Sequence, residues 1–471
     1  MALLRDHSAK QNREDSAMEG FTEKISEIVV GVTSKDLTPQ AIEKARQLFL
    51  DGIAVAVAGS IKEEPPSILA AHLKAKGAKE ECSVIGFGFK THPVDAAYIN
   101  GSSMHVLDYE PMWSPANHAV STNLPAILSL AEVLDFNGLE AATALVKGME
   151  TQGWLRQCSG HFDAKSIKNH PPGQVGPISS CVAAGHVLGF DAETQRHAFG
   201  IAASRCGALN ANAGTMVKMT HCGVAVSLGL DAAMLASNGF TANPNIFEVD
   251  KGYMQLYMPE FDYEGMLKFG PPFRLVDPGY SIKMFPSQFG THFVITAALE
   301  ARKQIDDVSK IKEINLTTPV MHYVNRPQPH QGLAGKFSFQ YTCCAALLDG
   351  EVVIDTFEDE RRFAPDMEAM LEKVNLTQDE NRPARFEEEV VDLEVVMEDG
   401  TKVVTRCDGP RGSWNGEPLE PGAHEAKVRM CLDCRLNNAD AERIIELSNN
   451  LEQLENKDLR EVLAIAAKPK S

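Results

Sequence analysis

The segment at residues 100–120, NGSSMHVLDYEPMWSPANHAV, gathers side chains that can move protons. They are Asp108, Glu110 and two histidines, His105 and His118. Histidines and carboxylates are the usual general acids and bases of enzymes. His118 lies in irregular backbone between a proline and a helix start, whereas His105 lies on the preceding helix, where a histidine is often only packed in the core. His118 is therefore the candidate for chemistry, with a structural role as the alternative.

The segment IKNHPPGQVGP, residues 167–177, contains a second candidate, His170. Two prolines follow this histidine and hold it in extended backbone just before a helix. Because free N–H groups at a helix N-terminus attract anions, the arrangement favours a carboxylate ligand. A loop histidine without a role is the alternative.

The segment GTMVKMTHCG, residues 214–223, places Lys218 and His221 three positions apart, and so on one face of a helix. A lysine in an apolar helix is costly unless it is paired with an acid. Lys218 is thus either a site residue or a lysine whose ammonium group reaches the surface. In a fourth segment, HYVNRPQP at 322–329, Tyr323 follows a predicted strand. The end of a strand often carries a functional residue, but a simple turn would also use the Asn and Pro of this segment.

Motifs for nucleotide, metal or nucleophile sites, such as a P-loop, HExxH or GxSxG, do not occur in the sequence. The ten cysteines are scattered, and CLDC at 431–434 is a single CxxC that suggests helix packing rather than zinc. We therefore expect neither a metal nor a cofactor. Unpaired cysteines also favour an intracellular location.

Helical periodicity extends from about residue 22 to 270, with alanine-rich helices predicted around 94–107, 124–155, 172–189, 192–205 and 214–240. Small residues let helices approach closely, so we expect a tightly packed domain. Beyond 270 a helix near 287–304, a strand at KIKEINLTTPV and a hairpin at EEVVDLEVVMEDGTKVVTR predict an α/β domain. The fold class is mainly α: a large all-helical domain plus a smaller α/β lid domain.

The predicted boundaries are a disordered lead at 1–20, a helical domain at 21–270, a lid domain at 271–410 and, at 411–471, C-terminal helices that return to the helical domain. The lead mixes acidic with basic residues and has no apolar core, unlike a signal or mitochondrial targeting peptide. A cytoplasmic location is thus favoured over a mitochondrial one.

The chain carries 64 acidic and 45 basic side chains, a formal charge of −19, and has no basic run that would follow a phosphate backbone. Nucleic acid is therefore not an expected partner. The longest apolar runs are shorter than the roughly 20 residues that cross a bilayer, so no membrane span is expected. A small polyanionic ligand would need a local pocket of Lys, Arg and His.

The motifs NGSSMHVLDYEPMWSPANH, NHPPGQVGP, GTMVKMTHCG, KMFPSQFGTH, YVNRP and KFSFQYTCCAALLDG occur in the order and approximate spacing of the MmgE/PrpD family. The sequence resembles this family over nearly its whole length. The resemblance implies a helical domain plus a lid domain, an active site in the cleft between them, no cofactor, and a homodimer.

The resemblance also implies site residues. The catalytic positions of the family fall on Asp108, His118, His170, Lys218 and Tyr323. Substrate-binding positions fall on Met112, His221, Lys283 and His292. Met112 replaces a threonine of the family, and Glu110 and Pro111 replace aspartates. A thioether cannot donate a hydrogen bond to a carboxylate and offers apolar volume instead.

Members of this family catalyse different reactions, so the resemblance is compatible with several functions. The resemblance favours a carbon lyase that decarboxylates cis-aconitate to itaconate, acting on a small di- or tricarboxylate without a cofactor. The alternatives are dehydration of 2-methylcitrate or another 2-alkylcitrate, epimerisation of an iminodisuccinate-type dicarboxylate, and a non-catalytic binding protein. All three reactions need an acid or base next to bound carboxylates.

Overall fold

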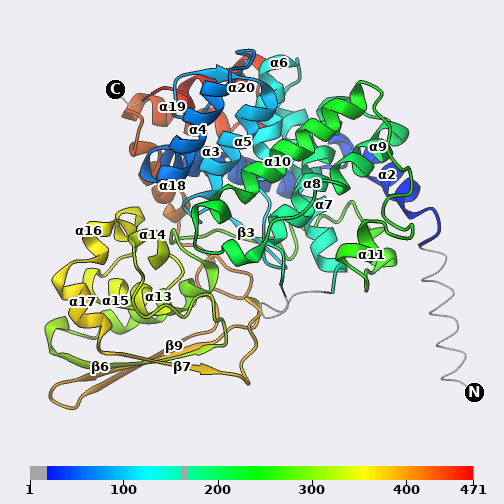
Figure 1. Cartoon of the computed structure of the whole chain (residues 1–471). Coiled ribbons are helices and arrows are strands. Elements are labelled where there is room, and N and C mark those ends of the chain that lie inside the picture. The colour runs from blue at the N-terminus through cyan, green and yellow to red at the C-terminus, as the bar shows by residue number, and fades with distance from the viewer. Residues whose placement is uncertain (1–17, 161–166, 470–471) are drawn as a thin grey trace, which may run out of the picture.

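The computed structural model describes residues 18–160 and 167–469, so most of the predicted lead at 1–20 lies outside the described residues. Helices predominate, which confirms the mainly α class. We call residues 18–266 together with 423–466 the helical domain, and residues 289–407 the lid domain. In Figure 1 the lid domain lies to the lower left of the larger helical domain.

The described residues of the helical domain begin with eleven helices: α2 Phe21–Gly31, α3 Pro39–Lys62, α4 Glu64–Lys76, α5 Pro93–His105, α6 Leu124–Val133, α7 Gly138–Cys158, α8 Pro171–Val187, α9 Ala192–Ala203, α10 Met216–Ser237, α11 Tyr253–Tyr257 and α12 Tyr263–Met266. A two-stranded ribbon, β1 Cys82–Ser83 and β2 Lys90–Thr91, precedes α5.

Short 3₁₀ turns occur in both domains. They lie at Ser34–Asp36, Asn210–Asn212 and Leu451–Gln453 in the helical domain, and at Val308–Lys310 and Ile354–Phe357 in the lid domain.

Small residues bring α5, α8 and α10 together at the centre of the domain. A Cβ atom on Gly223 of α10 would lie 2.3 Å from the carbonyl oxygen of Tyr98 in α5, so only glycine allows this approach. By length and composition α10 is apolar enough to cross a membrane, but its residues are mostly buried by neighbouring helices. It is the core helix of this domain.

The single helix predicted around 124–155 was wrong, because the chain breaks between α6 and α7. Asn137 caps the second helix: its side-chain oxygen accepts a hydrogen bond of 2.9 Å from the backbone N–H of Glu140. Asparagine is one of the residues preferred at this position, so the break follows from the local sequence.

The lid domain packs helices on one face of a four-stranded sheet with the order β7-β6-β8-β9. Its elements are α13 Phe289–Arg302, β6 Ile311–Pro319, α14 Gly332–Gly335, α15 Phe339–Asp349, α16 Asp359–Arg362, α17 Pro365–Leu371, β7 Val374–Asp379, β8 Val391–Met397 and β9 Lys402–Cys407. The predicted strand and hairpin are confirmed as β6 and as β8 with β9, which pair antiparallel. β7 pairs parallel with β6 and was not predicted.

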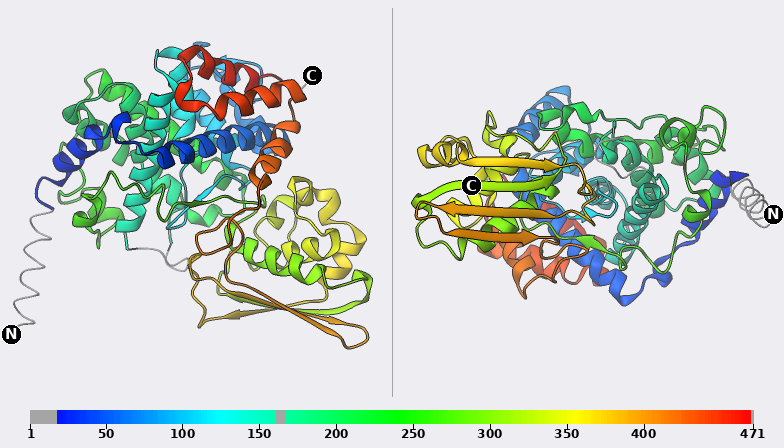
Figure 2. Two further views of the ribbon diagram at one scale, coloured as in Figure 1. Left: turned by 180° about the vertical axis from the view of Figure 1, so that it is seen from behind. Right: turned by 90° about the horizontal axis from the view of Figure 1, so that it is seen from below.

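Three C-terminal helices return to the helical domain: α18 Ala423–Asp433, α19 Asn438–Ser448 and α20 Asn456–Ala466. Figure 2 shows α18 to α20 in orange and red; α18 and α19 pack against the blue helix α3, and α20 packs against α19 and α6. The lid domain is therefore inserted between two parts of the helical domain.

Between the domains lies a small sheet that the sequence analysis missed. Its strands are β3 Met112–Trp113, β4 Asn117–His118 and β5 Tyr280–Ser281, in the order β4-β3-β5. An ion pair of the buried Lys336 with the partly buried Glu63, at 3.2 Å, also joins the lid to the helical domain. The segment 112–118 is thus fixed at the domain junction.

Candidate active site

A cavity of about 100 Å³ lies where the two domains meet. The helical domain contributes Asp108, Met112, Asn117, His118, His170, Asn210 and Lys218 to its lining. The lid side contributes Gln288, Phe289, Tyr323, Phe337, Arg385, Phe386 and Glu387. All five predicted catalytic positions, and Met112 among the predicted binding positions, therefore face one cavity.

Asp108 is the centre of the charged part of this site. It follows α5 in left-handed backbone with φ 51°, which is uncommon for a residue other than glycine and often marks a functional position. Its carboxylate pairs with the Lys218 ammonium group at 2.8 Å and, more closely, with that of Lys283. Burial alone would raise the pKa of Asp108, but the two ammonium groups hold it well below its ordinary value.

Lys283 contacts Asp108 but is not among the described residues that line the cavity. Its ammonium group donates hydrogen bonds of 2.8 Å to the carbonyl oxygens of Asp108 and Ser287. Burial lowers the pKa of Lys283 to about 8, against the opposing attraction of Asp108. The ammonium form of Lys283 therefore predominates below about pH 8.

His118 lies on β4 with its ring between two carboxyl groups. Its Nε2 atom is 3.8 Å from Asp108 Oδ1, and its Nδ1 atom is 2.8 Å from Glu110 Oε1. The backbone carbonyl of His118 accepts a hydrogen bond of 2.7 Å from Gln152 Nε2. Burial lowers the pKa of His118 well below its ordinary value, so the imidazole is neutral and can accept a proton.

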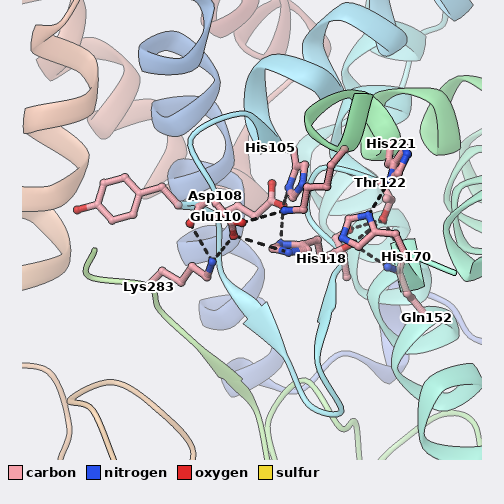
Figure 3. A network of polar contacts seen from close by, with 12 residues as sticks. His105, Asp108, Glu110, His118, Thr122, Gln152, His170, His221 and Lys283 are labelled. Carbon is pink, nitrogen blue, oxygen red and sulfur yellow. Dashed lines mark hydrogen bonds and ion pairs between the residues drawn. The ribbon is translucent and has the colours of Figure 1, made fainter. Parts of the chain in front are cut away.

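Glu110 and His105 belong to the same network, and the sequence analysis did not assign them to the site. The Nδ1 atom of His105 lies 2.7 Å from Glu110 Oε1, and both side chains are fully buried. Burial raises the pKa of Glu110 well above its ordinary value, with a smaller contribution from the charge of Asp108. Figure 3 shows His105, Glu110 and His118 side by side, with Lys283 beyond Asp108.

His170 precedes α8, as the sequence predicted, and its Nδ1 atom is 3.2 Å from that of His221. The expectation of a helix N-terminus with free N–H groups was wrong. Pro171 and Pro172 have no N–H group, and the N–H group of Gly173 donates to the carbonyl of His170. The start of α8 therefore presents an imidazole to the cavity rather than backbone amides.

Lys218 and His221 share one face of α10, as predicted, but only Lys218 reaches the cavity. Lys218 does not extend to the surface, because it pairs with Asp108 and lies 5.2 Å from the centre of the Phe337 ring. His221 lies behind His170, where burial lowers its pKa to about 4.

The lid supplies a hydroxyl group and an apolar wall. Tyr323 accepts a hydrogen bond of 2.9 Å from Gln288 Nε2, and burial raises its pKa, so the phenol stays protonated. Met112 faces Phe289 and Phe386 around the cavity. His292 is not among the described lining residues; its ring packs on Phe289, with 5.1 Å between ring centres.

The lid segment 384–387 also lines the cavity, and the sequence analysis missed it. The Ser114 hydroxyl donates a hydrogen bond to Glu387, a contact between residues 273 positions apart. No short-range pattern marks such a contact, so only the fold brings this segment to the site.

Three histidine nitrogens, from His105, His118 and His170, lie within 4.8 Å of one another, a spacing that a metal ion could bridge. The ammonium group of Lys218 contributes positive charge to the surroundings of all three rings, and that of Lys283 contributes it at His105 and His118. A divalent cation would be repelled there, whereas an anion would be attracted. The charge distribution therefore fits a carboxylate ligand better than a metal.

The two domains match the two halves of one family. Residues 23–266 match the MmgE/PrpD N-terminal domain, and residues 285–453 match the MmgE/PrpD C-terminal domain. Cis-aconitate decarboxylase of Mus musculus is 30% identical over 93% of this chain and 92% of the mouse protein. That of Homo sapiens is 30% identical over 93% of each chain.

A more distant relative is the mitochondrial 2-methylcitrate dehydratase of Yarrowia lipolytica, 22% identical over 77% of this chain and 74% of that protein. These matches agree with the resemblance seen in the sequence motifs. The chain belongs to the MmgE/PrpD family.

Proposed function

We propose that this lyase decarboxylates cis-aconitate to itaconate. One observation carries the proposal: two ammonium groups, of Lys218 and Lys283, surround the single carboxylate of Asp108 beside the cavity. They give the site an excess of positive charge within a chain whose formal charge is −19. A small polycarboxylate would neutralise that excess. The 30% identity to two cis-aconitate decarboxylases supports this substrate.

The reaction needs positioned charges and one proton. The carboxylate on the CH₂ carbon next to the double bond leaves as CO₂, and its bonding electrons form a new double bond to the central carbon. The electrons of the old double bond move to the far carbon, which an enzyme acid protonates. Because that carbon carries a carboxylate, the intermediate has enolate character, which nearby cations stabilise.

His118 and His170 are the groups that can supply this proton. Burial keeps both imidazoles neutral without substrate, because it lowers their pKa values well below the ordinary value. A substrate with three carboxylates brings negative charge next to the rings, which raises those pKa values again. Substrate binding thus prepares the acid that the reaction uses.

The test is incubation of the purified protein with cis-aconitate, 2-methylcitrate and iminodisuccinate in separate samples, with the products identified by NMR. We expect itaconate and CO₂ from cis-aconitate. Turnover of another substrate, with cis-aconitate left unchanged, would overturn the proposal. A protein that turns over none of the three would support a binding role instead.

Dehydration of 2-methylcitrate or another 2-alkylcitrate is the second candidate. Met112, Phe289 and Phe386 give the cavity an apolar side that cis-aconitate does not require but an alkyl arm would fill. The same charged groups would then remove a proton next to a carboxylate and protonate a leaving hydroxyl. The NMR experiment separates the two candidates by their products.

A further inference from the structure

Glu110 lies behind the cavity wall, in contact with two imidazole rings. Its Oε1 atom is 2.7 Å from His105 Nδ1 and 2.8 Å from His118 Nδ1. Glu110 is fully buried and is not among the described residues that line the cavity. Of the two imidazoles that contact Glu110, only that of His118 lines the cavity, so His118 is the direct connection between Glu110 and the cavity.

We propose that Glu110, supported by His105, is a positioning residue that holds His118 with Nδ1 turned inward and Nε2 facing the cavity. The proposal rests on the proposed function only in assigning proton transfer to His118. In active sites, a carboxylate behind a histidine commonly fixes both the ring orientation and the nitrogen that carries the proton.

Asp108 does not orient the ring of His118. The 3.8 Å between Asp108 Oδ1 and His118 Nε2 exceeds the length of a hydrogen bond. Lys218 and Lys283 also occupy the two oxygens of Asp108. The shortest side-chain contact of His118 with a charged group among the described residues is therefore that with Glu110.

His105 keeps Glu110 in place. Its ring stands edge-to-face against that of His118, with 4.4 Å between ring centres and an angle of 69°. The contact of His118 Nδ1 with Glu110 has the distance but not the alignment of a hydrogen bond, whereas that of His105 has both. Glu110 is thus anchored by His105 and sets which edge of the His118 ring is turned away from the cavity.

The burial of Glu110 needs an explanation, because a carboxyl group without exposure is destabilising unless polar partners compensate. His105 and Glu110 are five positions apart in the chain, and the turn at Asp108, with φ 51°, folds the chain back between them. The same turn that presents Asp108 to the cavity therefore brings Glu110 under His118.

The test compares wild type with Glu110→Gln, which keeps the shape of the side chain but changes what its end can donate and accept. We expect kcat on cis-aconitate to fall by about 10–100-fold, the usual loss for a residue behind an active-site ligand, with KM nearly unchanged. Glu110→Asp keeps the carboxyl group and should recover part of kcat.

Glu150→Gln is the matched control. Glu150 is also fully buried, burial raises its pKa to about 7, and it accepts a hydrogen bond from the backbone N–H of Leu275. It is not among the described residues that line the cavity, so its amide variant should keep wild-type kcat. Equal losses of kcat in both amide variants would show a general effect of removing a buried carboxyl group and would overturn the proposal.

A second readout does not depend on turnover. In ¹⁵N-histidine-labelled protein, the His118 signals, assigned by their absence in His118→Asn, report which ring nitrogen carries the proton. We expect one tautomer, protonated at Nδ1, in wild type and a mixture in Glu110→Gln. If that variant does not fold, Glu110→Leu, which also removes the carboxyl group, is measured instead. An unchanged tautomer would overturn the proposal, and this holds even if cis-aconitate proves not to be the substrate.

Discussion

Asp51 and Asp108 are both buried carboxylates held by two nitrogen groups, but they lie in different surroundings. Asp51, on α3, contacts Lys427 Nζ at 2.6 Å and His424 Nε2 at 3.0 Å, both from α18. Asp108 contacts Lys218 at 2.8 Å and Lys283 more closely. The two clusters use nearly the same chemistry in one chain.

The surroundings of the two carboxylates differ in a way that distinguishes a structural ion pair from one in a functional site. Lys427 also donates a hydrogen bond of 2.8 Å to the carbonyl of Tyr109, so the Asp51 cluster anchors the loop next to Asp108. Neither Asp51 nor Lys427 is among the described residues that line the cavity. Asp108 has left-handed backbone, a cavity in front of it and neutral histidines beside it. A buried ion pair alone does not indicate a site, whereas its combination with these features does.

The largest expected effect separates the two histidines that line the cavity from the histidine that contacts Asp51. His118→Ala and His170→Ala should each lower kcat by about two to four orders of magnitude, the range for a positioned acid or base. His424→Ala, in the Asp51 cluster, should leave kcat close to wild type. Steady-state kinetics on cis-aconitate measure all three variants. Normal turnover in the first two would remove these histidines from the mechanism.

Asp51→Asn should lower the free energy of unfolding by about 3–5 kcal/mol, because it leaves the buried ammonium group of Lys427 without its countercharge. Asp108→Asn should cost less stability, since water or anions in the cavity can solvate Lys218, but should cost far more activity. Urea denaturation followed by circular dichroism measures the first quantity for both variants. A larger loss of stability in Asp108→Asn would reverse the comparison.

The pH dependence tests the ammonium group of Lys283. Burial lowers its pKa to about 8, so the charged form that holds Asp108 is lost as pH rises through that value. We expect kcat/KM to fall about tenfold per pH unit above pH 8, since this ratio reports groups of the free enzyme. Lys283→Arg keeps its charge at high pH and should move the fall upward. An unchanged profile in that variant would assign the fall to another group.

The smallest effect concerns Met112, which lines the cavity but is not a member of either cluster. Met112→Thr exchanges apolar volume for a hydroxyl that can donate to a carboxylate, a bond of about 1.5–3 kcal/mol. If cis-aconitate is the native substrate, its kcat/KM should be kept or improved. If the substrate carries an alkyl arm, that substrate should lose about 1–3 kcal/mol of transition-state binding. An unchanged ratio of kcat/KM between cis-aconitate and 2-methylcitrate would show that position 112 does not contact the substrate.

Much of the fold was predictable because its signals are local. Helical periodicity and the EDG turn of the hairpin depend on neighbouring residues, and both predictions are confirmed. The small sheet β4-β3-β5 was not predictable, since its two-residue strands carry no periodicity and β5 lies far along the chain from β3. β7 was missed because its exposed residues alternate with partly buried ones and form no apolar run.

The residues of the candidate site were likewise predictable only where the signal is local. His118 and His170 stood out as histidines in irregular backbone next to a helix start, and Lys218 as a lysine in an apolar helix, whereas Asp108 was assigned through the resemblance to the family. His105 was set aside, since a histidine on a helix resembles a core residue and its contact with Glu110 requires the left-handed turn at Asp108. Local patterns identify unusual residues, but long-range packing decides which of them meet.

The return of the C-terminal helices to the helical domain affects the order in which the protein is completed during synthesis. Asp51 and Lys427 are 376 residues apart in the chain. At roughly 5–20 residues per second, a ribosome needs about 20–75 s to make that stretch. Throughout this time α3 lacks the ammonium group that neutralises Asp51 and the apolar face of α18 that covers it, while the whole lid domain is made. The helical domain, although it is translated first, is the last part of the protein to be finished.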